Sequence, residues 1–363
     1  MTKKPTIVDI AEALGVSTAT VHRALHNGPD VTAATRNRVL LMAKKLGYKP
    51  NLAARSLASK RRLRISVNTP RGITSFWNEV WTGIEEEKRS LDIDNVVLEF
   101  RTYSQMGTDE LAAFEATLDS GVDGIIAFPG NPEGLKPLMK QAARAKIPVV
   151  FVATDAPGTE RLAIVSVDTL ASGSLAADLM GKIIRGRGAV GVTLTSTAII
   201  EHMQKYDAFR ETMHRLHSEL RVQAPIEDHG TEQIAYEKSR KFLVDHKDVA
   251  GMYVTTEASI PVINAARDLG RLDKVTIVAT DLFPALVEEM RGGAVVATIY
   301  QRPRTQGRMA FRVLYDYLVN GENPPLPTSF APHLVMPGNL DFFLQRVSME
   351  FSPGESRRLD LGD

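Results

Sequence analysis

After residue 64 the chain alternates short apolar runs with amphipathic segments of helical length. Segments such as WNEVWTGIEEEKRSL and ASGSLAADLMGKIIR have helical periodicity, and apolar runs separate most of them. This alternation predicts an α/β fold with doubly wound parallel sheets. Nine apolar runs suit two sheets better than one, so we expect two lobes. The predicted strands are residues 65–68, 96–102, 124–128, 149–152, 163–166, 189–194, 251–255, 275–280 and 296–300.

The residues before this body predict three short helices with explicit start signals. Thr6, with Asp9 three residues later, begins the first helix, and Gly15 ends it. Ser17 caps a second helix almost at once, and Thr32 caps a third. The short connection between the first two helices is typical of a helix-turn-helix. We expect the third helix to close a small core through Val39, Met42, Ala43 and Leu46.

The charge of the chain is divided unevenly. Residues 1–64 contain 13 Lys or Arg against 3 Asp or Glu, a net charge of +10. The other 299 residues contain 31 against 40, a net charge of −9, so the overall charge is only +1. A basic segment of this density attracts phosphate, which indicates double-stranded DNA as the partner.

The exposed face of the predicted second helix carries residues that can read a major groove. Its apolar side faces the core through Val21, which leaves Thr18, Ala19, His22 and Arg23 outside. Arg23 can present two donors to a guanine edge, and Ala19 can contact a thymine methyl. The alternative is a solvated face, which is the common state of polar residues on an isolated helix.

Residues 6–59, TIVDIAEALGVSTATVHRALHNGPDVTAATRNRVLLMAKKLGYKPNLAARSLAS, resemble the DNA-binding head and hinge of the LacI/GalR family of bacterial transcription regulators. The resemblance implies a hinge that becomes helical when two subunits occupy an operator, with Leu57 as a wedge in the minor groove. Without the head, Leu57 would be read as an ordinary linker leucine. His22 stands where the family usually has Ser; it either contacts DNA or fills space. The predicted DNA-contacting residues are Thr6, Ser17, Thr18, Ala19, Thr20, His22, Arg23, Asn27, Thr32, Tyr48, Asn51, Ala54, Arg55 and Leu57.

The resemblance also divides the chain into parts. We expect a helix-turn-helix domain at 1–49, a hinge at 50–64, a two-lobed periplasmic-binding-protein-like effector and dimerisation domain at 65–346, and a polar tail at 347–363. The tail has no leucine-rich heptads, which favours a homodimer over a tetramer. Two heads would then bind a roughly palindromic operator. Repression is the family's usual output.

Ligands of open parallel sheets bind beyond the carboxyl ends of the strands, so the residues after each strand are the candidates for an effector site. Asp281 and Gln301 each follow a predicted strand and align with residues that hold hydroxyls in related sugar binders. A carboxylate and an amide together suit a polyol, so a sugar or sugar derivative is the expected effector. Asp281 could instead be the N-cap of the next helix. Asp168 aligns with an acid that borders the cleft in many relatives.

Other candidate effector residues depart from the family's pattern. Phe76 and Trp77 replace a common Phe-Phe pair and could either stack on a sugar ring or belong to the core. An Arg often found in relatives is absent, and a cation is kept only if Lys205 takes its place. The predicted effector-binding residues are Phe76, Trp77, Asp168, His202, Lys205, Thr256, Glu257, Asp281 and Gln301.

Several classes of protein are disfavoured. The chain has no Cys, so neither disulfides nor thiolate metal sites are expected, and we predict no cofactor or metal. It shows neither a signal peptide nor a long uncharged apolar stretch, which favours the cytoplasm over export or a membrane and argues against a transport binding protein. An enzyme is the other alternative, because four histidines lie near one another in the sequence, but their spacing fits no metal or catalytic motif. Those histidines are His202, His214, His217 and His229.

Overall fold

The computed structural model describes residues 6–25, 31–46, 62–71, 74–91, 93, 95–104, 108–324 and 328–349. The chain divides into two compact units, Met1–Arg61 with Tyr315–Glu322 and Arg62–Leu314 with Asn323–Asp363. The second unit contains both sheets. None of the described helices combines the length and apolar character that crossing a bilayer requires.

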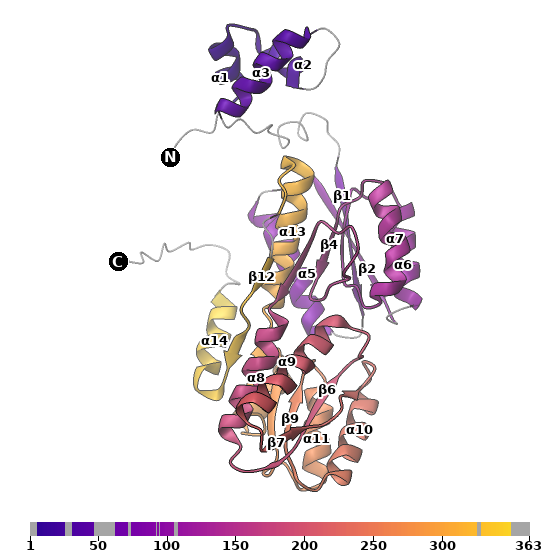
Figure 1. Cartoon of the computed structure of the whole chain (residues 1–363), viewed down its shortest axis with the longest axis vertical. Helices are drawn as coiled ribbons and strands as arrows, with labels where there is room; N and C mark the ends of the chain where they lie inside the picture. Colours follow the sequence, from indigo (N-terminus) through magenta and orange to yellow (C-terminus); the bar gives the residue numbers. More distant parts are fainter. Residues whose placement is uncertain are drawn as a thin grey trace, which may run out of the picture. The chain divides into compact units, whose positions relative to one another are not determined.

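The described residues before 47 form the three expected helices, α1 Ile7–Leu14, α2 Thr18–Leu25 and α3 Ala33–Leu46 (Figure 1). The hydroxyl of Thr6 accepts from the backbone N–H of Asp9, whose carboxylate accepts from Thr6 in return. Ser17 and Thr32 each accept from the N–H three residues later, at 3.1 and 3.3 Å. All three start signals are therefore confirmed.

The core between these helices is formed by small and branched side chains. Val39 and Ala43 are buried and Met42 packs against them, as expected. The prediction that Leu46 helps to close this core is wrong, because Leu46 is the last residue of α3 and is 36% exposed. The buried members of the core are Ile10, Ala11, Val21, Ala24, Val39 and Ala43.

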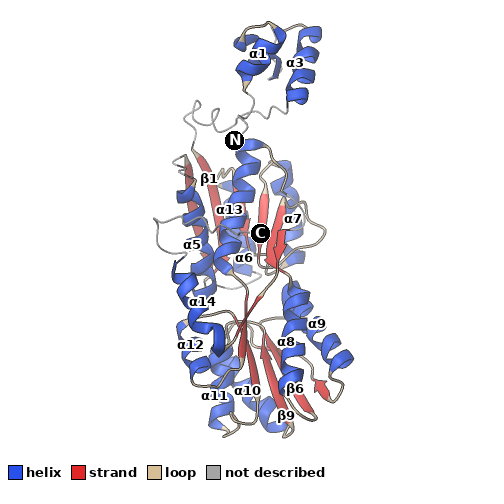
Figure 2. Cartoon of the chain, turned by 90° about the vertical axis from the view of Figure 1, so that its left-hand side faces the viewer, coloured by secondary structure: helices blue, strands red, loops and turns tan. Residues whose placement is uncertain are grey.

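Lobe 1 of the larger unit consists of sheet A with helices α5 Thr74–Ser90, α6 Thr108–Asp119 and α7 Pro132–Arg144. The strands of sheet A are all parallel, in the order β12-β5-β4-β3-β1-β2. They are β1 Leu63–Pro70, β2 Val96–Tyr103, β3 Gly124–Ala127, β4 Val149–Val152, β5 Ala163–Val167 and β12 Thr328–Phe330. Helices α6 and α7 pack on one face of β3 and β4, with α5 on the other side of the sheet (Figures 1 and 2).

Lobe 2 consists of sheet B with helices α8 Thr169–Ile183, α9 Ile200–Leu216, α10 Glu232–Asp245, α11 Ser259–Asp268, α12 Pro284–Arg291 and α14 Pro337–Met349. Its main strand order is β13-β11-β10-β9-β6-β7, and β8 also pairs with β6. Only β13 is antiparallel among these described strands. The strands are β6 Gly188–Leu194, β7 Leu220–Val222, β8 Ile226–Glu227, β9 Val249–Val254, β10 Thr276–Thr280, β11 Ala297–Tyr300 and β13 His333–Val335.

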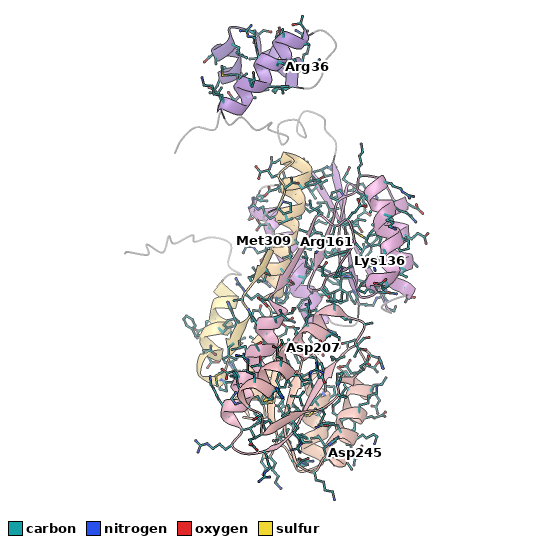
Figure 3. The ribbon with its side chains drawn as sticks, in the orientation of Figure 1. Arg36, Lys136, Arg161, Asp207, Asp245 and Met309 are labelled. Atoms are coloured by element: carbon teal, nitrogen blue, oxygen red, sulfur yellow. The ribbon has the colours of Figure 1, made fainter. Side chains whose placement is uncertain are left out.

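Neighbouring residues of the sheet B strands point to opposite faces and fill two separate cores. Ile277 of β10 packs with α10, α11, α12 and α14, while Val278 packs with α8 and α9. Helices therefore cover both faces of the sheet, as the doubly wound pattern predicts (Figure 2). Exposed polar residues such as Asp207 of α9 lie on the outside of this arrangement (Figure 3).

The chain crosses between the lobes three times. It leaves lobe 1 after β5, returns after β11 through α13 Pro303–Asn320 to β12, and enters lobe 2 again at β13. Helix α13 packs closely on α5 at Gly307. A Cβ added at this glycine would lie 2.0 Å from the carbonyl oxygen of Val80, so the position has no room for a side chain. Residues that follow β3 and β4 in lobe 1 and β9, β10 and β11 in lobe 2 lie close together, which is where the expected ligand site lies.

Candidate functional site

Seven of the nine predicted effector residues line one cavity between the two lobes. Lobe 1 contributes residues from the start of α5 and from the ends of β3 and β4. Lobe 2 contributes the start of α9 and the residues that follow β9, β10 and β11. The lining residues are Phe76, Trp77, Phe128, Ala153, Ile199, Glu201, His202, Thr255, Thr256, Glu257, Asp281 and Gln301.

The wall from lobe 1 is aromatic. Phe76 and Trp77 pack edge to face with ring centroids 4.9 Å apart, and Trp77 and Phe128 do the same at 5.2 Å. All three side chains are buried. The two interpretations of Phe76 and Trp77 are thus compatible, because the rings belong to the core and also line the cavity. The indole Nε1 of Trp77 has no hydrogen-bond partner.

Asp281 and Gln301 form a buried pair at the ends of β10 and β11. The Oδ1 of Asp281 accepts from the backbone N–H of Gln301 at 3.1 Å, and Oδ2 accepts from the amide Nε2 at 2.7 Å. Asp281 has a φ of 65°, a left-handed conformation that non-glycine residues seldom adopt. The N-cap of α12 is Phe283, so the alternative that Asp281 caps this helix is not supported.

Lys205 lies behind the cavity lining and is almost completely buried. Its ammonium donates to Gln301 Oε1 at 2.6 Å and to the carbonyl oxygen of Thr255 at 3.3 Å, and it pairs with Glu201. Glu201 is a lining residue that our sequence analysis missed. The signal was present, since Glu201 and Lys205 are four residues apart and lie on one face of a helix.

Burial controls the protonation of the titratable groups in this site. It raises the pKa of Asp281 to about 7, although Gln301 and Lys205 favour the ionised form. It also lowers the pKa of His202 to about 4, so that the imidazole is neutral at pH 7. The pKa of Glu257 is raised by burial as well. More than one carboxyl group in this site is therefore costly to ionise unless a hydrogen-bond donor or a positive charge stabilises the carboxylate.

Hydrogen bonds join the lobes beside the cavity. Glu257 Oε1 in lobe 2 accepts from the backbone N–H of Phe76 in lobe 1 at 2.6 Å, and the hydroxyl of Thr154 accepts from the N–H of Glu201 at 3.3 Å. The cavity leaves about 40 Å³ for the centres of water molecules. A single water needs roughly 10–15 Å³ by this measure, so only a few waters fit, and a larger ligand requires the lobes to separate.

Asp168 is not brought into this cavity. It is exposed at the start of α8, where its Oδ1 accepts from the backbone N–H of Ala171 at 2.9 Å and caps the helix. Asp168 therefore follows a strand because it caps the next helix, and not because it lines the cavity. His214, His217 and His229 are also absent from the lining, and the described residues contain no group of His, Asp and Glu that could hold a metal.

The helix-turn-helix residues fall into three sets. Thr18, Ala19 and Arg23 are exposed on α2, as a groove-reading face requires, and Thr20 is partly exposed. His22 is part of α2. Thr6, Ser17 and Thr32 are exposed residues that cap helices. The remaining predicted residues lie outside the described residues: Asn27, Tyr48, Asn51, Ala54, Arg55 and Leu57.

Comparisons with known proteins agree with this arrangement. Residues 65–323 match the model of the periplasmic binding protein domain, and residues 6–51 match that of the bacterial regulatory proteins of the lacI family. Catabolite control protein A of Priestia megaterium is 28% identical over 268 residues, 73% of this chain and 78% of that protein. Catabolite control protein A of Staphylococcus epidermidis is 26% identical, and the match covers 91% of this chain and 97% of that protein. The solved structure of GanP, a glucose-galactose binding protein from Geobacillus stearothermophilus, has a TM-score of 0.71 at 24% identity and covers 77% and 99% of the two chains.

Proposed function

The chain belongs to the lacI family of bacterial regulatory proteins and carries their periplasmic binding protein domain, and we propose that a small polyhydroxy effector in the interlobe cavity controls its affinity for operator DNA. The protein is a DNA-binding transcription regulator and not an enzyme. The observation that carries the proposal is the cavity itself, where the Asp281–Gln301 pair of lobe 2 faces the aromatic wall of lobe 1.

The chemistry of this cavity suits a sugar or a similar polyol. A carboxylate accepts from hydroxyl groups, and the amide of Gln301 can both donate and accept. Aromatic rings such as Phe76 cover the apolar face of a sugar ring. These features support the nine effector residues predicted above except Asp168, whose carboxylate is used in capping α8, and Lys205, which acts through Gln301.

Coupling to DNA follows from the position of the site between two lobes. A ligand that changes the separation of the lobes changes the spacing of the two hinges in a homodimer, and thereby the fit of both heads to a two-fold operator. The coupling is reciprocal, so DNA must change effector affinity by the same factor. We propose repression as the output, with domain boundaries at residues 49, 64 and 346.

Binding of candidate effectors to the purified full chain tests this proposal. Neutral hexoses, pentoses and polyols are screened by thermal shift, because a ligand that binds only the folded state raises its stability. The hits are repeated with Asp281→Ala and with Asp207→Ala, an exposed control on α9. We expect a shift that Asp281→Ala abolishes and Asp207→Ala retains. A shift that survives Asp281→Ala would place the ligand elsewhere and contradict the proposal.

The DNA half of the proposal has its own measurement. Operator fragments selected from a random duplex library are titrated by fluorescence anisotropy, with and without the effector. We expect the selected sequences to be palindromic and the effector to change the dissociation constant by about 5-fold to 150-fold. Selected sites without two-fold symmetry would argue against a homodimer on the operator.

A further inference from the structure

The cavity lining is rich in carboxylates and poor in cations. Glu201, Glu257 and Asp281 all line it, and its described lining contains neither Lys nor Arg. The only nitrogen base in the lining is His202, which burial keeps neutral at pH 7. An anionic ligand would therefore meet negative charge without a free cation to bind.

The cation closest to the cavity, Lys205, is already occupied. An ammonium can donate three hydrogen bonds, and that of Lys205 interacts with Glu201, Gln301 and the carbonyl oxygen of Thr255. A phosphate or carboxylate of a ligand could reach this ammonium only by displacing one of these partners. Displacement of Glu201 would leave a buried carboxylate without a partner, which is costly.

The other two carboxylates have hydrogen bonds but no ion pair with the described residues. Asp281 accepts from the two nitrogens of Gln301, and Glu257 accepts from the N–H of Phe76. Burial is the main cause of the raised pKa of Asp281; the charge of Lys205 lowers this pKa, and the charge of Glu257 raises it further. Two like charges with little water between them are stabilised by a cation placed within reach of both.

The same cavity holds two buried polar atoms without hydrogen-bond partners. These are Nε1 of Trp77 and Nδ1 of His202, both on side chains that are more than nine-tenths buried. Buried polar atoms in folded proteins nearly always have partners. Trp77 can only donate, so its partner must carry an acceptor such as a hydroxyl oxygen. A ligand with hydroxyl groups can supply such an acceptor, and the carboxylates favour a ligand that also carries a positive charge.

We propose that the cavity is selective for a ligand that carries an ammonium group together with hydroxyl groups, such as an amino sugar, and that it rejects phosphorylated and carboxylated sugars. This inference rests on the proposed function, because it names the class of polyol that binds. With the lobes separated enough to admit the ligand, its ammonium lies against Glu257 and Asp281, and its hydroxyl groups complete the hydrogen bonds of Trp77 and His202. The aromatic rings cover the apolar face of the ligand.

The test compares matched hexoses that differ in one charged group. Calorimetric titrations at pH 7, where the amine of a hexosamine is mainly protonated, use D-glucosamine, D-galactosamine and D-mannosamine, the three parent hexoses and the three hexose 6-phosphates. We expect at least one amino sugar to bind about tenfold or more tightly than its parent, and no 6-phosphate to bind. N-acetylation of that amino sugar, which removes the charge, should abolish the preference.

Two variants connect the preference to the carboxylates. Glu257→Gln should reduce the ratio of amino sugar to parent affinity, because it removes a negative charge and keeps an oxygen that can accept from the N–H of Phe76. Glu133→Gln, an exposed residue of α7 paired with Lys136, should leave the ratio unchanged.

The two ways in which the test can fail are distinct. Equal or tighter binding of the parent hexose, or binding of a 6-phosphate, overturns the ammonium inference but leaves a polyol effector in place. Failure of every hexose to bind overturns the inference and contradicts the proposed effector class as well.

Discussion

The carboxylate of Glu257 accepts a hydrogen bond from the backbone N–H of Phe76, with 2.6 Å between Oε1 and the nitrogen. Glu257 follows β9 in lobe 2, and Phe76 lies in the first turn of α5 in lobe 1. The first N–H groups of a helix have no partner inside the helix and favour negative charge nearby. A side chain of one lobe thus satisfies the helix start of the other, beside the cavity that separates them.

Loss of this hydrogen bond should open the ligand-free protein. In Glu257→Ala the N–H of Phe76 loses its acceptor, so the open arrangement of the lobes becomes more populated. We expect small-angle X-ray scattering to show a larger radius of gyration than for the parent chain. Glu133→Ala, which removes an exposed ion pair, serves as the control and should change nothing. An unchanged radius in Glu257→Ala would mean that this bond does not hold the lobes.

Gly173 should be intolerant of a side chain. A Cβ at this position of α8 would lie 2.2 Å from the carbonyl oxygen of Lys205 on α9, closer than atoms can approach. Gly173→Ala should force the helices apart and lower the free energy of unfolding by about 1–3 kcal/mol. Urea denaturation measures this effect. Gly338→Ala in α14, where a Cβ meets nothing within 4 Å, is the matched control. Equal stability of the two variants would contradict close packing at Gly173.

Stability should depend on the protonation of Asp281. Its pKa is about 7 in the folded chain against 3.8 in the unfolded chain, so folding favours the protonated form. The contribution of this proton is fully present below pH 3.8 and is lost as the pH rises through 7. Asp281→Asn removes the titration, so its stability relative to the parent should increase by a few kcal/mol from pH 4 to pH 8. Chemical denaturation at several pH values gives this difference. A difference that is independent of pH would refute the raised pKa.

Arg23 should read a base rather than only the phosphate backbone. It is exposed on α2, and two donors on its guanidinium match a guanine edge. Arg23→Ala should reduce discrimination at one operator position by about 1–3 kcal/mol. Anisotropy titrations with single-base operator variants measure this loss, and Arg210→Ala on α9 is the control outside the head. An equal loss of affinity on every sequence would assign Arg23 to phosphate contacts.

Strands and helices of the larger unit were predictable because their periodicity is local. Each of the nine expected runs is a strand, with ends that differ by no more than two residues. Four strands were missed, and all are only two or three residues long: β7, β8, β12 and β13. Segments this short carry no alternation of their own, and pairing with a distant strand, such as β13 with β11, is what makes them strands.

The sequence by itself determined the helix-turn-helix pattern, the two-lobed α/β architecture and the cleft between its lobes, because caps, apolar periods and strand ends are properties of neighbouring residues. Only the tertiary structure decided what each polar group does there. Asp168 and Asp281 both follow strands, yet one caps α8 and the other is buried against Gln301. The group that a carboxylate pairs with depends on segments that are far apart in the sequence and come together only in the folded chain. No local sequence pattern encodes which segments meet.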